Sequence, residues 1–113
     1  EELRRGQTVV GPHRDDLGLE IDGMDARTFG SRGQQRLLAL ALRLAEVLPV
    51  SEAAGTSPVL LLDDALSELD PDVRGNVLQE IQSAEQVFLT SPEPLAVSGA
   101  DRWVVDAGGI VAA

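Results

Sequence analysis

An unbroken apolar run closed by two acidic residues constrains the fold of this chain most. Residues 59–62 read VLLL, and Asp63 and Asp64 follow them directly. Such a run is typical of a central parallel strand that is buried on both faces and has polar side chains at its carboxyl end. A helix pattern and a second apolar run follow. The segment 59–90 therefore predicts a strand–helix–strand unit with a right-handed crossover, and an α/β fold.

The helix of this unit has a clear start in the sequence. Asp70 precedes Pro71, which combines a good N-cap residue with a proline at the first helical position. Apolar residues recur at helical spacing through residues 73–81 and predict one buried face. Residues 86–90, QVFLT, then predict a second short strand, also buried.

A longer helix is predicted for residues 34–48, QQRLLALALRLAEVL, because most of them are strong helix formers. Its polar residues fall on a narrow stripe, so we expect the helix to be buried on most sides. Ser31 and Gln34 have the spacing of a capping box, which makes Ser31 the predicted N-cap. Pro49 is expected to end the helix, and residues 51–58 are expected to form a polar loop.

Short strands are predicted on both sides of these elements. Alternating polarity around the turn signal Asp22-Gly23 predicts antiparallel strands within residues 7–28, including a short strand at 8–10. Residues 102–113 predict a C-terminal hairpin with a turn at its centre. The expected fold therefore combines mainly parallel core strands, flanking helices and antiparallel hairpins.

Composition excludes several classes of protein. The net charge is −10, with nine arginines and no lysine, so the chain is not a general polyanion binder. Any contact with DNA would need a local arginine cluster or basic surface supplied elsewhere. The absence of cysteine excludes disulfides and thiolate metal sites, and no segment approaches the ~20 apolar residues of a membrane span. The chain does not begin with Met, and we expect it to be a piece of a longer protein.

The acidic pair after the first strand predicts metal chemistry. Asp63 and Asp64 repel each other unless a cation or a proton intervenes. One carboxylate can hold Mg²⁺, which prefers oxygen ligands, while the other polarises an attacking water. A helix-capping or solvated acidic pair is an equally good interpretation of these two residues alone. A receiver-type acidic pocket is excluded because it requires a lysine.

The segment FGSRGQQR, residues 29–36, predicts a seat for a phosphate group. A helix N-terminus presents unpaired amides and a partial positive charge. Gly33 would let a ligand approach the backbone, and Ser31 would add a hydroxyl donor. A serine N-cap with a flexible glycine is the simpler interpretation of this loop alone. Its combination with the acidic pair in one chain favours a phosphate and magnesium site.

These motifs resemble those of ABC-type ATPase heads. FGSRGQQR resembles the signature loop, VLLLDD the Walker B strand, and SELD, residues 67–70, the D-loop. Together with GPHRDD, residues 11–16, they are similar in this order to the C-terminal part of the RecF family of bacterial recombination mediators. The resemblance covers the chain from Gly11 to its end. No G-x-x-x-x-G-K-[ST] loop is present, so the resemblance places the Walker A half in a preceding segment.

The resemblance implies that two heads sandwich ATP and divide its chemistry. The residues expected to reach the γ-phosphate of ATP bound to the partner are Ser31, Gly33 and Gln34. For ATP on its own chain, Asp63 would hold Mg²⁺ and Asp64 would act as the general base or orient water. Residues 67–70, including Ser67 and Asp70, would line the dimer interface. Thr90 stands where a switch histidine is common and would contact the γ-phosphate.

The same resemblance implies an ATP-dependent mediator that repairs single-strand gaps and stalled forks in the cytoplasm. Its implied partners are DNA, RecO, RecR and a second copy of the chain, and no membrane. Many ABC ATPases carry glutamate at the position of Asp64, so aspartate implies slow hydrolysis. Arg14 is expected to pair with an aspartate of its own loop, and the alternative is a contact with nucleotide or DNA. The alternatives are the head of another ABC-type, SMC-like or transporter ATPase, and a non-catalytic interaction domain that has kept the fold.

Overall fold

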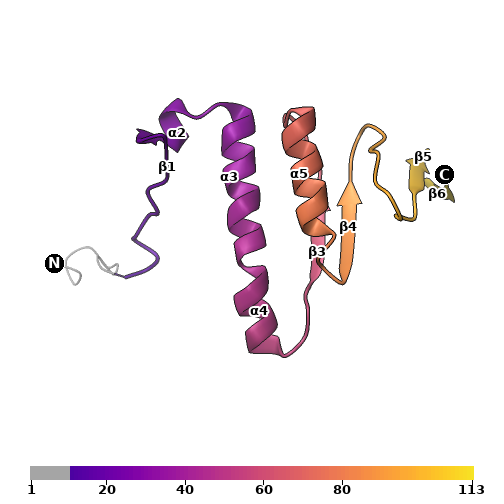
Figure 1. Ribbon diagram of the computed structural model, residues 1–113, viewed down its shortest axis with the longest axis horizontal. Helices are drawn as coiled ribbons and strands as arrows, with labels where there is room; N and C mark the ends of the chain where they lie inside the picture. The colour runs from indigo at the N-terminus through magenta and orange to yellow at the C-terminus, as the bar shows by residue number, and fades with distance from the viewer. Residues whose placement is uncertain (1–10) are drawn as a thin grey trace.

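A parallel pair of strands forms the centre of the molecule. The computed structural model describes residues 11–113, so the strand expected at 8–10 lies outside the described part. Strands β3 (Val59–Asp63) and β4 (Gln86–Thr90) run parallel, and helix α5 (Pro71–Ile81) connects them and lies over β3 (Figure 1). The predicted strand–helix–strand unit is confirmed, and the boundaries of β4 are those expected.

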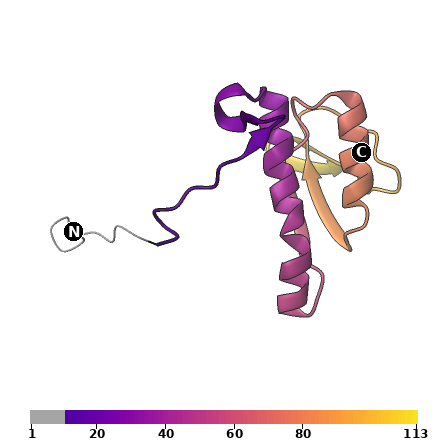
Figure 2. The ribbon, with the colours of Figure 1, turned by 60° about the vertical axis from the view of Figure 1, so that its left-hand side comes forward.

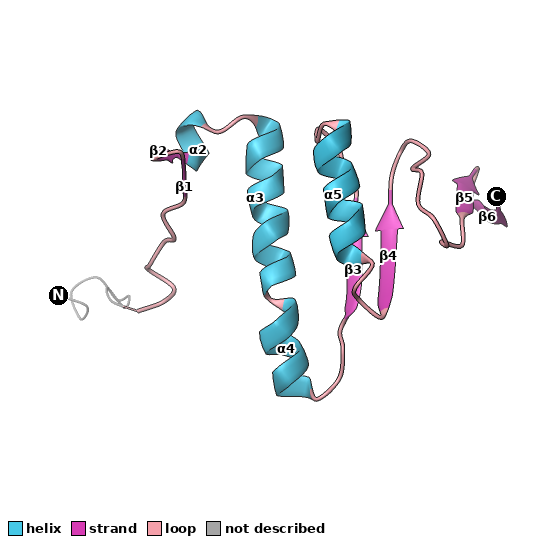
Figure 3. Ribbon diagram, viewed as in Figure 1, coloured by secondary structure: helices cyan, strands magenta, loops and turns pink. Residues whose placement is uncertain are grey.

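Two antiparallel hairpins flank this unit, as Figure 3 shows. The first joins β1 (Glu20–Ile21) to β2 (Met24–Asp25), and the second joins β5 (Trp103–Asp106) to β6 (Gly109–Ala112). Both two-residue turns have positive φ angles at each position, which is the requirement of a tight hairpin turn. The residues in these turns are Asp22, Gly23, Ala107 and Gly108. The C-terminal hairpin is thus confirmed.

The strands predicted within residues 7–28 are shorter than expected. Only β1 and β2 pair among the described residues of this segment, and helix α2 (Ala26–Phe29) follows β2 at once. Asp25 ends the strand and caps the helix, because its carboxylate accepts the backbone N–H of Thr28 at 2.8 Å. Side-chain-to-backbone hydrogen bonds of this kind compete with strand pairing, and here the strand ends at Asp25, where the helix cap forms.

Two helices replace the single helix predicted for residues 34–48. Helix α3 (Arg32–Ala45) is followed by helix α4 (Val47–Ala54), and they stack end to end (Figures 1 and 2). Pro49 does not end a helix but lies in the first turn of α4, where a backbone N–H has no intrahelical partner to lose. Residues 51–54, expected in a loop, are helical, and Gly55 ends α4 with a φ of 71°. None of the helices within residues 11–113 is long and apolar enough to cross a membrane.

One apolar core lies between α3, α5 and the inner face of the parallel strands. Its buried side chains come from both helices, from β3 and from the loop that follows β3. They are Leu40, Leu62, Leu66, Leu69, Val77, Leu78 and Ile81. Half-buried Val73 packs against them, so the predicted buried face of α5 is confirmed.

Some apolar surfaces that were expected to be buried are exposed. On the outer face of the parallel pair, Val59, Leu61 and Phe88 are 54%, 74% and 58% exposed. Leu40 is the single buried residue of α3. Within residues 11–113, the predictions that β3 is buried on both faces, that β4 is buried and that α3 is buried on most sides are therefore wrong. The radius of gyration is 18.6 Å, larger than the value of about 13 Å for a compact domain of this length.

Candidate functional site

The carboxyl ends of β3 and β4 bring three predicted site residues together. Asp63 lies opposite Thr90 in the strand register, and the Thr90 hydroxyl donates to Oδ1 of Asp63 at 2.5 Å. The same hydroxyl oxygen accepts the backbone N–H of Asp64 at 3.0 Å. Thr90 thus holds both acidic residues. Its hydroxyl proton is engaged with Asp63 in this structure, so its contact with a γ-phosphate stays a prediction.

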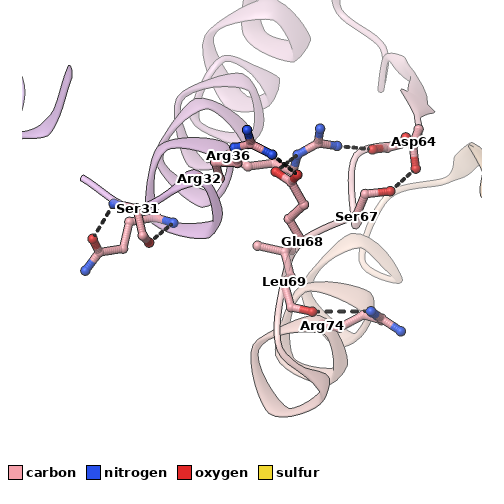
Figure 4. Close-up of polar contacts among 9 residues, drawn as sticks. Ser31, Arg32, Arg36, Asp64, Ser67, Glu68, Leu69 and Arg74 are labelled. Carbon is pink, nitrogen blue, oxygen red and sulfur yellow. Dashed lines mark hydrogen bonds and ion pairs between the residues drawn. The ribbon is translucent and has the colours of Figure 1, made fainter. Parts of the chain in front are cut away.

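Asp64 is held from several directions. Its backbone has a φ of 48°, in the left-handed region that aspartate tolerates better than most residues. The Ser67 hydroxyl donates to Oδ1 of Asp64, and Arg36 donates through NH1 to its backbone carbonyl at 2.5 Å (Figure 4). A carboxylate fixed in this way can orient a water molecule or accept a proton from it.

Asp63 fits the role of a single protein ligand for Mg²⁺. Its side chain is exposed, and no hydrogen bond or ion pair within residues 11–113 occupies Oδ2. The same residues contain no group of three or more acidic, histidine or cysteine side chains that could hold a metal. Mg²⁺ commonly takes one or two carboxylates and completes its shell with waters and substrate phosphates. One free carboxylate oxygen therefore suits an ion that is bound together with a nucleotide.

The N-terminus of α3 forms the second part of the candidate site. The backbone N–H of Gln34 donates to the Ser31 hydroxyl at 3.1 Å, and the Ser31 N–H donates to Oε1 of Gln34 at 2.9 Å (Figure 4). This reciprocal pair is the predicted capping box. Both residues are exposed. The Ser31 hydroxyl accepts a hydrogen bond here and can still donate its proton, as can the first amides of the helix.

Gly33 allows a close approach within the chain itself. A Cβ atom added at Gly33 would lie 2.8 Å from the carbonyl oxygen of Glu68. The first turn of α3 therefore packs directly on the loop that follows β3. The sequence alone suggested a ligand as the reason for this glycine, whereas the structure shows a neighbouring backbone. Gln35 fixes the other side of the turn, since its amide donates to the carbonyls of Ala26 and Arg27 at 3.0 Å each.

The loop from Ser67 to Asp70 joins the two parts of the site. Leu69 is buried in the core, while Glu68 has a φ of 66° and is exposed. Asp70 caps α5 as predicted, because its Oδ1 accepts the N–H of Val73 at 3.1 Å. An open groove runs between this loop and the start of α3. The residues that line it include Ser31, Gly33, Gln34, Glu68 and Asp70.

Arg36 and Glu68 belong to the FGSRGQQR and SELD segments, but the sequence alone assigned neither residue a role of its own. The Nε atom of Arg36 lies 3.9 Å from Oε2 of Glu68, and NH1 of Arg32 lies 3.6 Å from Oε1 of Glu68. The sequence signals were membership of these two segments and, for Arg36, the polar stripe on the helix. Among the described residues, no hydrogen bond or ion pair connects Ser31, Gly33 or Gln34 with the acidic pair. The seat and the acidic pair are joined through Arg36 and the loop.

The segment 11–16 folds as a turn, in which the Arg14 N–H donates to the Gly11 carbonyl at 2.9 Å. Asp16 pairs with Arg27 of α2 at 3.4 Å, and both side chains are exposed. The predicted pairing of Arg14 with an aspartate of this loop stays a prediction.

Comparison with known proteins gives a consistent set of relatives. No family model matches the sequence. Three relatives are called "DNA replication and repair protein RecF". The protein from Heliobacterium modesticaldum is 48% identical over 90% of this chain, and that from Staphylococcus carnosus is 45% identical over 92%. The protein from a Synechocystis strain is 48% identical over 90%. These matches cover 30%, 27% and 26% of the relatives, so the chain spans less than a third of their length.

Solved structures give the same result. Two structures of the recombination mediator protein RecF in the RecFOR pathway, one with ATP and one described as RecF-ATPrS, match with a TM-score of 0.68 and 37% identity. The matches cover 99% of this chain for the ATP structure and 98% for the other, and 30% of each RecF chain.

Proposed function

We propose that this chain, which is homologous to the C-terminal part of RecF, supplies half of each composite ATP site in a homodimer. Its fold is that of the C-terminal portion of an ABC-type ATPase head. The observation that carries this proposal is the end of β3. There, Oδ2 of Asp63 has no hydrogen bond or ion pair within residues 11–113. The neighbouring Asp64 accepts a hydrogen bond from Ser67 at its carboxylate and one from Arg36 at its backbone carbonyl. One acid suits metal binding, and the other suits the orientation of water.

The two parts of the site act on different nucleotides in this proposal. Ser31, Gly33 and Gln34 meet the γ-phosphate of ATP on the partner, through the hydroxyl, the exposed amides and the positive end of the helix. Asp63 and Asp64 serve ATP on their own chain. Within residues 11–113, no hydrogen bond or ion pair joins the seat to the acidic pair, which is compatible with this division. Ser67 and Asp70 then lie along the interface between the two sites.

Asp63 holds Mg²⁺ in this arrangement, and the ion would neutralise charge on the phosphate oxygens. Asp64 orients the attacking water while Thr90 keeps both acids in register. The aspartate side chain is one methylene shorter than the glutamate that is common at this position. Its oxygens therefore sit further from the nucleotide, so we expect slow turnover, as suits a switch that must stay closed on DNA.

The Walker A half of the site belongs to a preceding segment. The relatives are more than three times as long as the matched region, and the chain has no P-loop lysine. The exposed outer face of the parallel pair, with Leu61 and Phe88, supports this assignment, because such a face needs an apolar partner. Further core strands from the preceding segment would cover it.

The wider role follows from the family. We propose an ATP-dependent recombination mediator that acts on DNA at single-strand gaps and stalled forks, with RecO and RecR as partners. It would act in the cytoplasm, where bacterial DNA lies. The net charge of −10 means that the DNA-binding surface must come largely from the rest of the protein.

The test is ATP-induced dimerisation and ATP turnover of the full-length protein. Ser31→Arg is expected to abolish the dimer, because its bulk fills the seat, and Asp64→Asn is expected to keep the dimer and stop turnover. The matched controls are Ser83→Arg at the end of α5 and Asp72→Asn in its first turn, both exposed and outside the site. If Ser31→Arg and Asp64→Asn both dimerise and hydrolyse ATP as the unmodified protein does, the proposal is wrong.

A further inference from the structure

Arg36 contacts the loop after β3 at two points. Its NH1 group donates to the backbone carbonyl of Asp64 at 2.5 Å, and its Nε atom lies 3.9 Å from the Glu68 carboxylate (Figure 4). The planar guanidinium presents several donors in a rigid fork, so one side chain can serve both acceptors at once. The Arg36 side chain is 35% exposed, which leaves it partly shielded from solvent.

The two residues that Arg36 contacts have unusual backbone conformations. Asp64 has a φ of 48° and Glu68 a φ of 66°, both in the left-handed region that residues other than glycine rarely adopt. Such conformations persist when the surrounding contacts hold them, and they often occur in parts that must be positioned for function. Arg36 supplies a contact at each of these points, so it constrains both ends of the loop.

Backbone packing supplies a second link between the same elements. Gly33 lies so close to the Glu68 carbonyl that a Cβ atom would approach to 2.8 Å. The first turn of α3 therefore cannot shift toward the loop without moving it. Because Arg36 follows one turn later on the same helix, a displacement of the helix end reaches the Asp64 backbone through both contacts.

We propose that Arg36 is a positioning residue that couples the phosphate seat at the start of α3 to the carboxylate of Asp64. The inference rests on the proposed function, in which the seat meets the partner's nucleotide while Asp64 serves the nucleotide of its own chain. Arg36 contacts neither nucleotide. It links binding of the partner's nucleotide at the seat to the position of the Asp64 carboxylate, which orients water for the nucleotide of its own chain. Turnover then requires a properly closed dimer.

The test compares Arg36→Gln with Arg43→Gln in the full-length protein. Arg43 lies on the same helix, and within residues 11–113 it pairs only with Glu46, at 3.3 Å, so it controls for loss of charge and helix propensity. We expect Arg36→Gln to lower kcat on the order of 10- to 100-fold, as small misplacements of a catalytic group do. The KM for ATP and the ATP concentration that gives half-maximal dimerisation should change less than about threefold, because the affected contact acts in the transition state.

A purely structural role would lower the thermal midpoint, ATP affinity and dimerisation together, and that pattern would overturn the inference. Turnover of Arg36→Gln within about twofold of the unmodified protein would overturn it as well. Arg36→Lys keeps the charge but lacks the planar fork, so it should restore only part of the lost turnover.

If Arg36→Gln does not fold, Glu68→Gln decides the question. It removes one anchor of Arg36 and leaves the bond to the Asp64 carbonyl, so turnover should fall while the dimer remains. Normal turnover in Glu68→Gln would then refute the coupling. If the unmodified protein neither dimerises with ATP nor hydrolyses it, the proposed function itself fails, which separates that outcome from a failure of Arg36 alone.

Discussion

Replacement of Gly33 by alanine should destabilise the protein, although the same change inside a helix usually stabilises it. Alanine is favoured over glycine in a helix interior by about 1 kcal/mol. At Gly33, however, the new Cβ atom would lie 2.8 Å from the Glu68 carbonyl oxygen, a distance that such atoms do not tolerate. The obstacle is a backbone atom of a residue with a φ of 66°, which has little freedom to move aside.

The expected magnitude follows from these two opposing effects. Overpacking of this kind costs about 1–3 kcal/mol. After subtraction of the gain in helix propensity, we expect Gly33→Ala to lower the free energy of unfolding by about 0–2 kcal/mol. Gly75→Ala is the matched control, because Gly75 lies inside α5 and nothing is within 4 Å of its added Cβ. That variant should gain about 1 kcal/mol.

The assay is denaturant unfolding of both variants in the full-length protein, followed by circular dichroism. The free energies of unfolding should differ by about 1–3 kcal/mol between the two variants, with unchanged dependence on denaturant. If Gly33→Ala is stabilised as much as Gly75→Ala, the close packing of α3 on the loop after β3 does not exist in solution. The proposed coupling of the phosphate seat to Asp64 would then lose one of its two structural links, the packing of α3 on this loop.

Three further predictions concern the ends of helices. Ser31→Ala removes the capping box of α3 and should lower the free energy of unfolding by about 1 kcal/mol, as measured by denaturant unfolding. Asp70→Ala should lower it by a similar amount, about 1 kcal/mol, whereas Asp70→Asn should retain most of the cap of α5. Hydrogen bonds from the side chain and backbone of Thr28 lower the pKa of Asp25. The Asp25 cap therefore stabilises the fold at pH values above the pKa that Asp25 has in the unfolded state. This stabilisation is lost as the pH falls through the lower pKa of the folded state. An NMR titration should show the lowered pKa, and Thr28→Ala should raise it toward its ordinary value.

The sequence contains enough local information to predict the strand–helix–strand unit, the two helix caps and the C-terminal hairpin. The caps and the hairpin turn depend on interactions between residues a few positions apart, and the strand–helix–strand unit follows from the order of apolar runs and a helical pattern along the chain. The Ser31–Gln34 capping box, for example, and the bond from Val73 to Asp70 each span three positions. The acidic pair could be placed at the end of a strand for the same reason, since its position follows directly from the apolar run.

Contacts between distant segments, and the resulting burial, required the structure. The Arg36 bond to Asp64 spans 28 positions, and no local pattern indicates which distant residue Arg36 contacts. Pro49 was misinterpreted because a proline signals a helix break, but only the fold shows whether a second helix begins there.

The sequence by itself thus determined the strand–helix–strand unit, the C-terminal hairpin and the positions of the acids and the capping serine. Tertiary structure alone decided that Gly33 accommodates the Glu68 backbone, that Arg36 ties α3 to Asp64, and that one face of the parallel pair stays open. The physical reason is that caps, turns and apolar runs obtain their free energy from neighbouring residues. Close backbone approaches and buried faces depend on which remote surfaces meet.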